Sequence, residues 1–171
     1  ESDYRSPLAV TTLVRINEDA HEVVVGDSGL RSLAVLGADG QIKGRPRQFG
    51  PAMLPVDIEF REGAALVASI GDLYSVSKSE DRPGLIASIT PSSTTVVIDG
   101  LYRLADIETA DLNNDNAEDF IVSGFGGSYG SASWFESQPD GTFAEHLLVD
   151  RPGAVRMQAH DFNDDGFLDI A

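Results

Sequence analysis

Two segments of one pattern constrain this chain more than any other feature of its sequence. Residues 111–119 and residues 161–169 both read D-x-N-x-D-[GN]-x-x-D, and their first residues are 50 positions apart. Oxygen side chains at positions 1, 3 and 5 can converge only where the backbone curls tightly, so position 6 must accept a positive φ. Gly166 meets this demand in the second segment, and Asn116 replaces it in the first. Because asparagine tolerates the left-handed region, we predict that the first loop is intact but weaker.

The pattern predicts a structural Ca²⁺ site in each segment. Side chains at positions 1, 3, 5 and 9 would supply oxygens, and the backbone carbonyl at position 7 would add one more. Several hard oxygens, three of them from carboxylates, suit Ca²⁺ better than Mg²⁺ or Zn²⁺. The predicted ligands are the side chains of Asp111, Asn113, Asp115 and Asp119 with the carbonyl of Ala117, and the side chains of Asp161, Asn163, Asp165 and Asp169 with the carbonyl of Phe167.

These segments also resemble two other kinds of loop, the EF-hand and the ordinary turn. An EF-hand begins in the same way, but it needs Glu at position 12 and a helix on each side. Position 12 of the first segment is Val122, and the flanking residues have strand character, so the EF-hand interpretation fails. Runs of Asp, Asn and Gly also form ordinary turns. Two runs with identical spacing favour metal loops over turns alone.

The two loops belong to a repeat of about 50 residues. The segments at residues 56–59 and 105–108 share the sequence Asp-Ile-Glu and lie 49 positions apart. Short β-type runs separated by turn residues follow one another at the 8–12-residue spacing of all-β folds. A period of this length with four strands per unit is typical of a β-propeller blade. We therefore predict an all-β chain of four-stranded antiparallel blades within a single propeller domain, with units at about 1–50, 51–100, 101–150 and an incomplete 151–171.

The first two units are expected to lack metal. The loop has shrunk to residues 61–63 in the second unit, and only a remnant is left at residues 17–19 in the first. The first unit offers strands at residues 8–14, 21–25 and 32–36, and Pro46 and Pro51 bracket a connection that we expect to be irregular.

The third and fourth units resemble the FG-GAP/VCBS repeats of Ca²⁺-binding β-propellers, such as those of integrin α heads. The resemblance rests on the metal loop, the glycine-rich residues 124–127, the strand segment 130–135 and the closing turn at residues 140–143. It implies a propeller fold with calcium as a structural cofactor. Propellers usually have four to eight blades, whereas 171 residues correspond to about three and a half. We therefore expect this chain to be part of a longer propeller.

Composition narrows the partners and the location. The net charge of −16 argues against nucleic acid and anionic membranes, which need clustered Lys and Arg. The sequence has no cysteine, so disulfide and thiol chemistry are excluded. No apolar run reaches the 18 residues of a membrane span, and residues 1–4 show no signal-peptide character. Calcium sites favour an extracellular or periplasmic location, because millimolar Ca²⁺ is found outside cells.

Several isolated signals are better explained by structure than by chemistry. Residues 126–130 match the nucleophile motif G-x-S-x-G around Ser128, but a strand follows where a helix is required. His21, His146 and His160 have no metal-ligand spacing and are expected to be strand or rim residues. Glu108 is expected to have a structural role on an inner strand, with an outer-shell role at the metal left open. We predict no catalytic residue and no enzyme activity for this chain.

The leading functional hypothesis is a non-catalytic Ca²⁺-binding module that presents a propeller face to a protein or polysaccharide outside the cytoplasm. Loops on a rigid scaffold suit such recognition. The alternative is an accessory domain, or a subunit, of a larger extracytoplasmic enzyme or cytochrome-containing redox complex.

Overall fold

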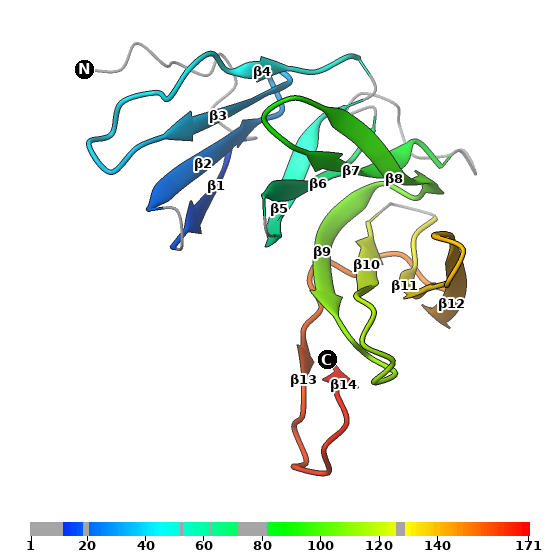
Figure 1. The fold of residues 1–171 in the computed structure, drawn as a ribbon. Coiled ribbons are helices and arrows are strands. Elements are labelled where there is room, and N and C mark those ends of the chain that lie inside the picture. The colour runs from blue at the N-terminus through cyan, green and yellow to red at the C-terminus, as the bar shows by residue number, and fades with distance from the viewer. Residues whose placement is uncertain (1–11, 19–20, 52, 62, 72–81, 126–128) are drawn as a thin grey trace.

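The structure is a computed structural model that describes residues 12–18, 21–51, 53–61, 63–71, 82–125 and 129–171. The described residues form three four-stranded antiparallel sheets and one two-stranded hairpin, in chain order (Figure 1). The predicted all-β architecture of propeller-like blades is confirmed to this extent; a closed ring of blades is not formed by the described residues. They also include no helix that is long and apolar enough to cross a membrane.

The first sheet consists of β1 (Thr12–Asn17), β2 (Glu22–Asp27), β3 (Ser32–Leu36) and β4 (Arg47–Gln48). Each strand pairs with the next one in the chain, so the sheet is a simple meander. Two expectations for this unit are wrong. The inner strand extends to Asn17, beyond the predicted end at residue 14. The connection between Pro46 and Pro51 contains the edge strand β4, because Arg47 and Gln48, which lie between the prolines, pair with Leu33 and Ser32 of β3.

The second sheet has the same topology and consists of β5 (Pro55–Arg61), β6 (Ala64–Ser69), β7 (Gly84–Ile89) and β8 (Thr94–Leu101). The shortened loop of this unit is a tight turn between β5 and β6, in which Gly63 has a φ of 72°.

The third sheet consists of β9 (Leu104–Ala110), β10 (Asp119–Gly124), β11 (Ala132–Ser137) and β12 (Phe143–Val149). The first metal loop joins β9 to β10. The hairpin is formed by β13 (Ala159–His160) and β14 (Asp169–Ile170), and the second metal loop joins these two strands. Both loops therefore occupy the same topological place, between the first and second strands of a unit.

Apolar side chains fill the space between successive sheets. Residues of β6 alternate between two cores: Leu66 packs in the cluster that contains Phe120 of the third sheet, and Val67 packs in the cluster that contains Val24 of the first. Because β6 is covered on both faces, it is apolar at nearly every position. Met157 precedes β13 and packs against Ile121, which places the hairpin on the other face of the third sheet.

Carboxylates on the inner strands link each unit to the next. Asp57 Oδ2 accepts a hydrogen bond from the backbone N–H of Ile107 at 3.0 Å. One unit later, Asp106 Oδ2 accepts the N–H of Met157 at 3.2 Å, and Glu108 Oε1 accepts the N–H of Ala159 at 2.9 Å. The repeated Asp-Ile-Glu segments thus hold adjacent inner strands together. The predicted structural role of Glu108 is confirmed.

This arrangement gathers acidic groups between the inner strands. Asp57 is almost fully buried and forms an ion pair with Arg15 of β1. Burial, together with the charge of Asp57, raises the pKa of Glu59 to about 7, although the Arg15 guanidinium acts in the opposite direction. Burial also raises the pKa of Asp106 to about 6, against the lowering effect of the Met157 N–H. The folded chain therefore disfavours ionisation of Glu59 and Asp106 relative to the same groups in water.

We predict that Asp57→Ala lowers the free energy of unfolding by about 2–4 kcal/mol. The substitution leaves the buried Ile107 N–H without its acceptor and Arg15 without its carboxylate. Urea unfolding at neutral pH measures the change. The exposed Asp150 is the control, because Asp150→Ala removes the same charge and should cost less than about 0.5 kcal/mol. Equal effects of the two substitutions would contradict the structural role of Asp57.

A second prediction concerns pH. The folded Glu59 keeps its proton up to a pKa of about 7, whereas the unfolded residue loses it near 4.5. The folded state therefore binds more protons between these values, and stability is lost as the pH rises through them. Glu59→Gln stays neutral, so its unfolding midpoint in metal-free buffer should fall less than that of the parent between about pH 5 and about pH 8. Parallel pH profiles for the two proteins would show the prediction to be wrong.

Candidate metal centre

The first loop is organised by hydrogen bonds from its own backbone to its own side chains. Asp111 Oδ1 accepts the N–H of Asp115 at 3.0 Å, and Asp111 Oδ2 accepts the N–H of Asn116 at 2.9 Å. Asn113 Oδ1 also accepts the N–H of Asp115, at 3.1 Å. Asp115 Oδ1 in turn accepts the N–H of Ala117 at 2.7 Å. Positions 1, 3 and 5 are thereby turned toward the backbone that curls around them.

The second loop repeats this pattern position by position. Asp161 accepts the N–H groups of Asp165 at 3.0 Å and of Gly166 at 2.8 Å. Asn163 Oδ1 accepts the N–H of Asp165 at 2.9 Å, and Asp165 Oδ1 accepts the N–H of Phe167 at 2.9 Å. The Gly166 N–H is the main cause that holds the pKa of Asp161 below its usual range. The predicted equivalence of the two loops extends to their hydrogen bonding.

Each loop needs two left-handed residues. Position 6 has a positive φ as the sequence predicts, at 66° for Asn116 and 87° for Gly166. Position 4 is also left-handed, at 58° for Asn114 and 60° for Asp164. Position 4 was not predicted from the sequence, although the occurrence of Asn and Asp there was a usable signal.

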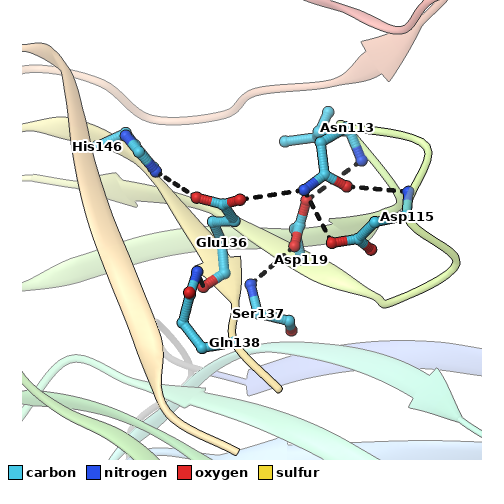
Figure 2. Close-up of polar contacts among 8 residues, drawn as sticks. Asn113, Asp115, Asp119, Glu136, Ser137, Gln138 and His146 are labelled. Carbon is cyan, nitrogen blue, oxygen red and sulfur yellow. Dashed lines mark hydrogen bonds and ion pairs between the residues drawn. The ribbon is translucent and has the colours of Figure 1, made fainter. Parts of the chain in front are cut away.

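The carboxylate at position 9 fastens the loop to the sheet. Asp119 is completely buried, and its Oδ2 accepts the N–H of Leu112 within the loop at 3.3 Å. Its Oδ1 accepts the N–H of Ser137 at the end of β11 at 2.9 Å (Figure 2). In the second loop, Asp169 Oδ2 accepts the equivalent N–H of Phe162 at 3.1 Å. Position 9 therefore holds both ends of its loop together.

The donor atoms of both loops have the chemistry that a hard cation requires. All ten predicted ligand groups lie in the described residues, and the atoms that they would offer are oxygens. In the first loop, the side-chain oxygens of Asp111, Asn113 and Asp115 each accept one hydrogen bond from within the loop, whereas a carboxylate has about four acceptor positions. Within the described part of the chain, however, no group of three or more His, Cys, Asp or Glu side chains lies close enough to hold a metal ion. The oxygens present fit calcium in kind, whereas the carboxylates are not drawn onto a common point.

The first loop also contacts neighbouring strands that the sequence patterns did not identify. Glu136 of β11 reaches the Asn113 side chain (Figure 2). On the other side, Arg61 at the end of β5 forms an ion pair with Glu118, and its guanidinium lies 5.3 Å from the centre of the Phe120 ring. Neither contact belongs to a repeated motif, so no sequence signal could have found it.

The remaining predicted residues have these positions in the structure. Ser128 lies outside the described residues. His146 is on the exposed strand β12, where it contacts Glu136, and His160 is on β13 beside Phe162. Phe135 is buried in the core, whereas its neighbour Trp134 is half-buried on the opposite face. These two adjacent aromatic residues follow the alternation expected of a strand.

We predict that Gly166→Ala destabilises the chain by about 1–2 kcal/mol, because alanine is strained at a φ of 87°. No atom lies near the added methyl group, so the cost is conformational rather than steric crowding. Asn116→Gly should be neutral or slightly stabilising for the same reason. Urea unfolding in EGTA measures both. If Gly166→Ala leaves the free energy of unfolding unchanged, the left-handed conformation assigned to position 6 is wrong.

Comparison with known proteins identifies the repeat. Residues 111–171 match the family model of the FG-GAP-like repeat. No curated protein and no solved structure matches the chain. FG-GAP repeats are generally non-catalytic modules that mediate protein interactions, typically outside the cell. The match covers both candidate loops, β10 to β12 and the terminal hairpin, so the similarity to FG-GAP-like repeats that the sequence resemblance predicted is found over residues 111–171.

Proposed function

We propose that this chain is a non-catalytic, calcium-binding interaction module that acts outside the cytoplasm. Its two loops hold one structural Ca²⁺ each, and its sheets present a rigid face to a protein or polysaccharide partner. The proposal joins the repeat family of residues 111–171 with the chemistry of the two loops.

The observation that carries the proposal is the shared hydrogen-bond pattern of the loops. In both, position 1 accepts the N–H groups of positions 5 and 6, position 3 accepts that of position 5, position 5 accepts that of position 7, and position 9 accepts that of position 2. An ordinary turn needs only one or two such contacts. The same five contacts in two loops of different sequence favour a common ligand.

Electrostatics supports a cation in each loop. The first loop holds Asp111, Asp115, Glu118 and Asp119, and the second holds four aspartates within nine residues. Like charges at such spacing repel one another in the absence of a counter-charge. A bound Ca²⁺ would offset this repulsion and draw the inward-facing oxygens together, with Asp119 and Asp169 closing the shells.

The arrangement of the sheets supports the interaction role. Both loops lie at the same end of their units and project toward the lower side of Figure 1. Loops on a packed β scaffold can vary without loss of the fold, and calcium would hold these two in a fixed shape. A module of this kind would bind its partner through a preformed surface.

Thermal unfolding with millimolar Ca²⁺ and with EGTA tests the proposal. At a tenfold excess over the dissociation constant, each occupied site contributes about 1.4 kcal/mol, which raises the midpoint by roughly 3–6 °C. Asp111→Ala and Asp161→Ala should each remove the contribution of one loop.

The control is Asp140→Ala, which removes a carboxylate from the turn between β11 and β12, where Asp140 accepts hydrogen bonds from Thr142. This variant should keep the full calcium-induced rise. An unchanged midpoint of the parent protein in Ca²⁺ and EGTA would refute calcium binding and leave the loops as turns.

A further inference from the structure

A carboxylate from a neighbouring strand reaches into the first loop. Glu136 lies on β11, outside the nine-residue motif. Its Oε1 accepts a hydrogen bond from Asn113 Nδ2 at 3.1 Å, and its Oε2 lies 2.8 Å from His146 Nε2 of β12 (Figure 2). Glu136 therefore connects the side chain at position 3 of the loop to the outer strand of the sheet.

The contact fixes the orientation of the Asn113 amide. Nδ2 donates to two carboxylates, Asp115 Oδ2 at 2.9 Å and Glu136 Oε1 at 3.1 Å. Oδ1 accepts the backbone N–H of Asp115 at 3.1 Å. If the amide were turned over, its oxygen would face two carboxylates and its NH₂ group would face an N–H donor, so that orientation is disfavoured. Oδ1 is thus kept on the backbone side of the loop, where position 3 must offer an oxygen.

Glu136 is itself held in place. His146 contacts its second oxygen, and the His146 ring stacks on Trp134 with ring centres 4.4 Å apart. Phe135, between Trp134 and Glu136 in the chain, is buried in the core. A side chain supported in this way can position a neighbour, because its own freedom is already reduced.

The second loop has no such support in the part of the chain that is described. Asn163 Oδ1 accepts the N–H of Asp165 as in the first loop, but none of the described carboxylates accepts a hydrogen bond from its amide NH₂. The two loops therefore have the same backbone hydrogen bonds, and they differ in the contacts that orient the side chain at position 3.

We propose that Glu136 is a positioning residue for the cation site of the first loop. This inference rests on the proposed calcium-binding function and extends it to a residue outside the motif. Glu136 does not coordinate the ion; it holds the Asn113 amide with Oδ1 available as a ligand. Residues that orient a ligand in this way typically change metal affinity by about 10–100-fold when they are removed.

The test isolates the first loop by using Asp161→Ala as the background. Calcium is titrated calorimetrically, and Tb³⁺ is titrated by luminescence sensitised through Trp134, the single tryptophan of the chain. Glu136→Ala should weaken binding about tenfold. Glu136→Gln should recover most of this loss, because its amide oxygen can still accept from Asn113 Nδ2. The two substitutions remove the same charge, so the difference between them measures positioning alone.

Glu145→Ala is the matched control. Glu145 lies on β12 opposite Phe135 and accepts a hydrogen bond from Ser133. The substitution therefore removes one carboxylate from the other face of the same sheet. It should leave the affinity of the first loop unchanged, and the effect of Glu136→Ala should persist at high ionic strength, where distant charges are screened. Equal affinities for Glu136→Ala and Glu145→Ala would overturn the proposal, and so would equal losses in Glu136→Ala and Glu136→Gln.

The experiment separates this inference from the function on which it rests. A parent protein that binds no Ca²⁺ at either loop overturns both. A parent that binds, with Glu136 variants that bind equally well, overturns the positioning role alone. If Glu136→Ala does not fold in EGTA, His146→Phe removes the contact that holds Glu136 and should weaken the first loop in the same direction. Unchanged binding in His146→Phe would then overturn the proposal.

Discussion

The fold depends on a hydrogen bond between a side-chain carboxylate of one unit and the backbone of the next. The inner strand of a four-stranded sheet has a hydrogen-bonded neighbour on one side only. The backbone N–H groups on its other edge therefore need acceptors from elsewhere. Asp57 supplies one to Ile107, and Asp106 supplies one to Met157 a full period later. The inner strands can therefore stand side by side without forming one continuous sheet. The acidic groups of these strands also lie close together: Arg15 pairs with Asp57, and burial together with the charge of Asp57 raises the pKa of Glu59 to about 7.

A second carboxylate, Asp119, connects this scaffold to the candidate metal site. It begins β10, is completely buried, and divides its two oxygens between the loop and the end of β11. Asp119 therefore links the conformation of the loop to the position of β11. The two left-handed residues of each loop have a conformational cost, and the hydrogen bonds to positions 1, 3, 5 and 9 offset it without any metal.

The sequence predicted most of this architecture because the local pattern and the repeat agreed. The predicted strand segment 130–135 overlaps β11, and the repeated Asp-Ile-Glu segments marked strands that do lie side by side. The prediction failed at β1 and β4, where the apolar pattern is short or interrupted by proline and pairing with a neighbour decides the structure. In the loops, the motif identified the oxygens and position 6. It could not identify Glu136 or Arg61, because their contacts arise from folding rather than from spacing.

Arg61 belongs to the second unit, which has no nine-residue loop, and it contacts the first metal loop in the third unit. The turn between β5 and β6 is too short for a nine-residue loop, and Arg61 is the last residue of β5. The guanidinium pairs with Glu118 and lies over Phe120, so a fixed positive charge stands beside an acidic loop. The first loop is thus bordered by a cation from the preceding unit and by Glu136 from its own sheet. Since both contacts depend on the packing of complete sheets, two loops that share a motif and a hydrogen-bond pattern still differ in the charged side chains around them.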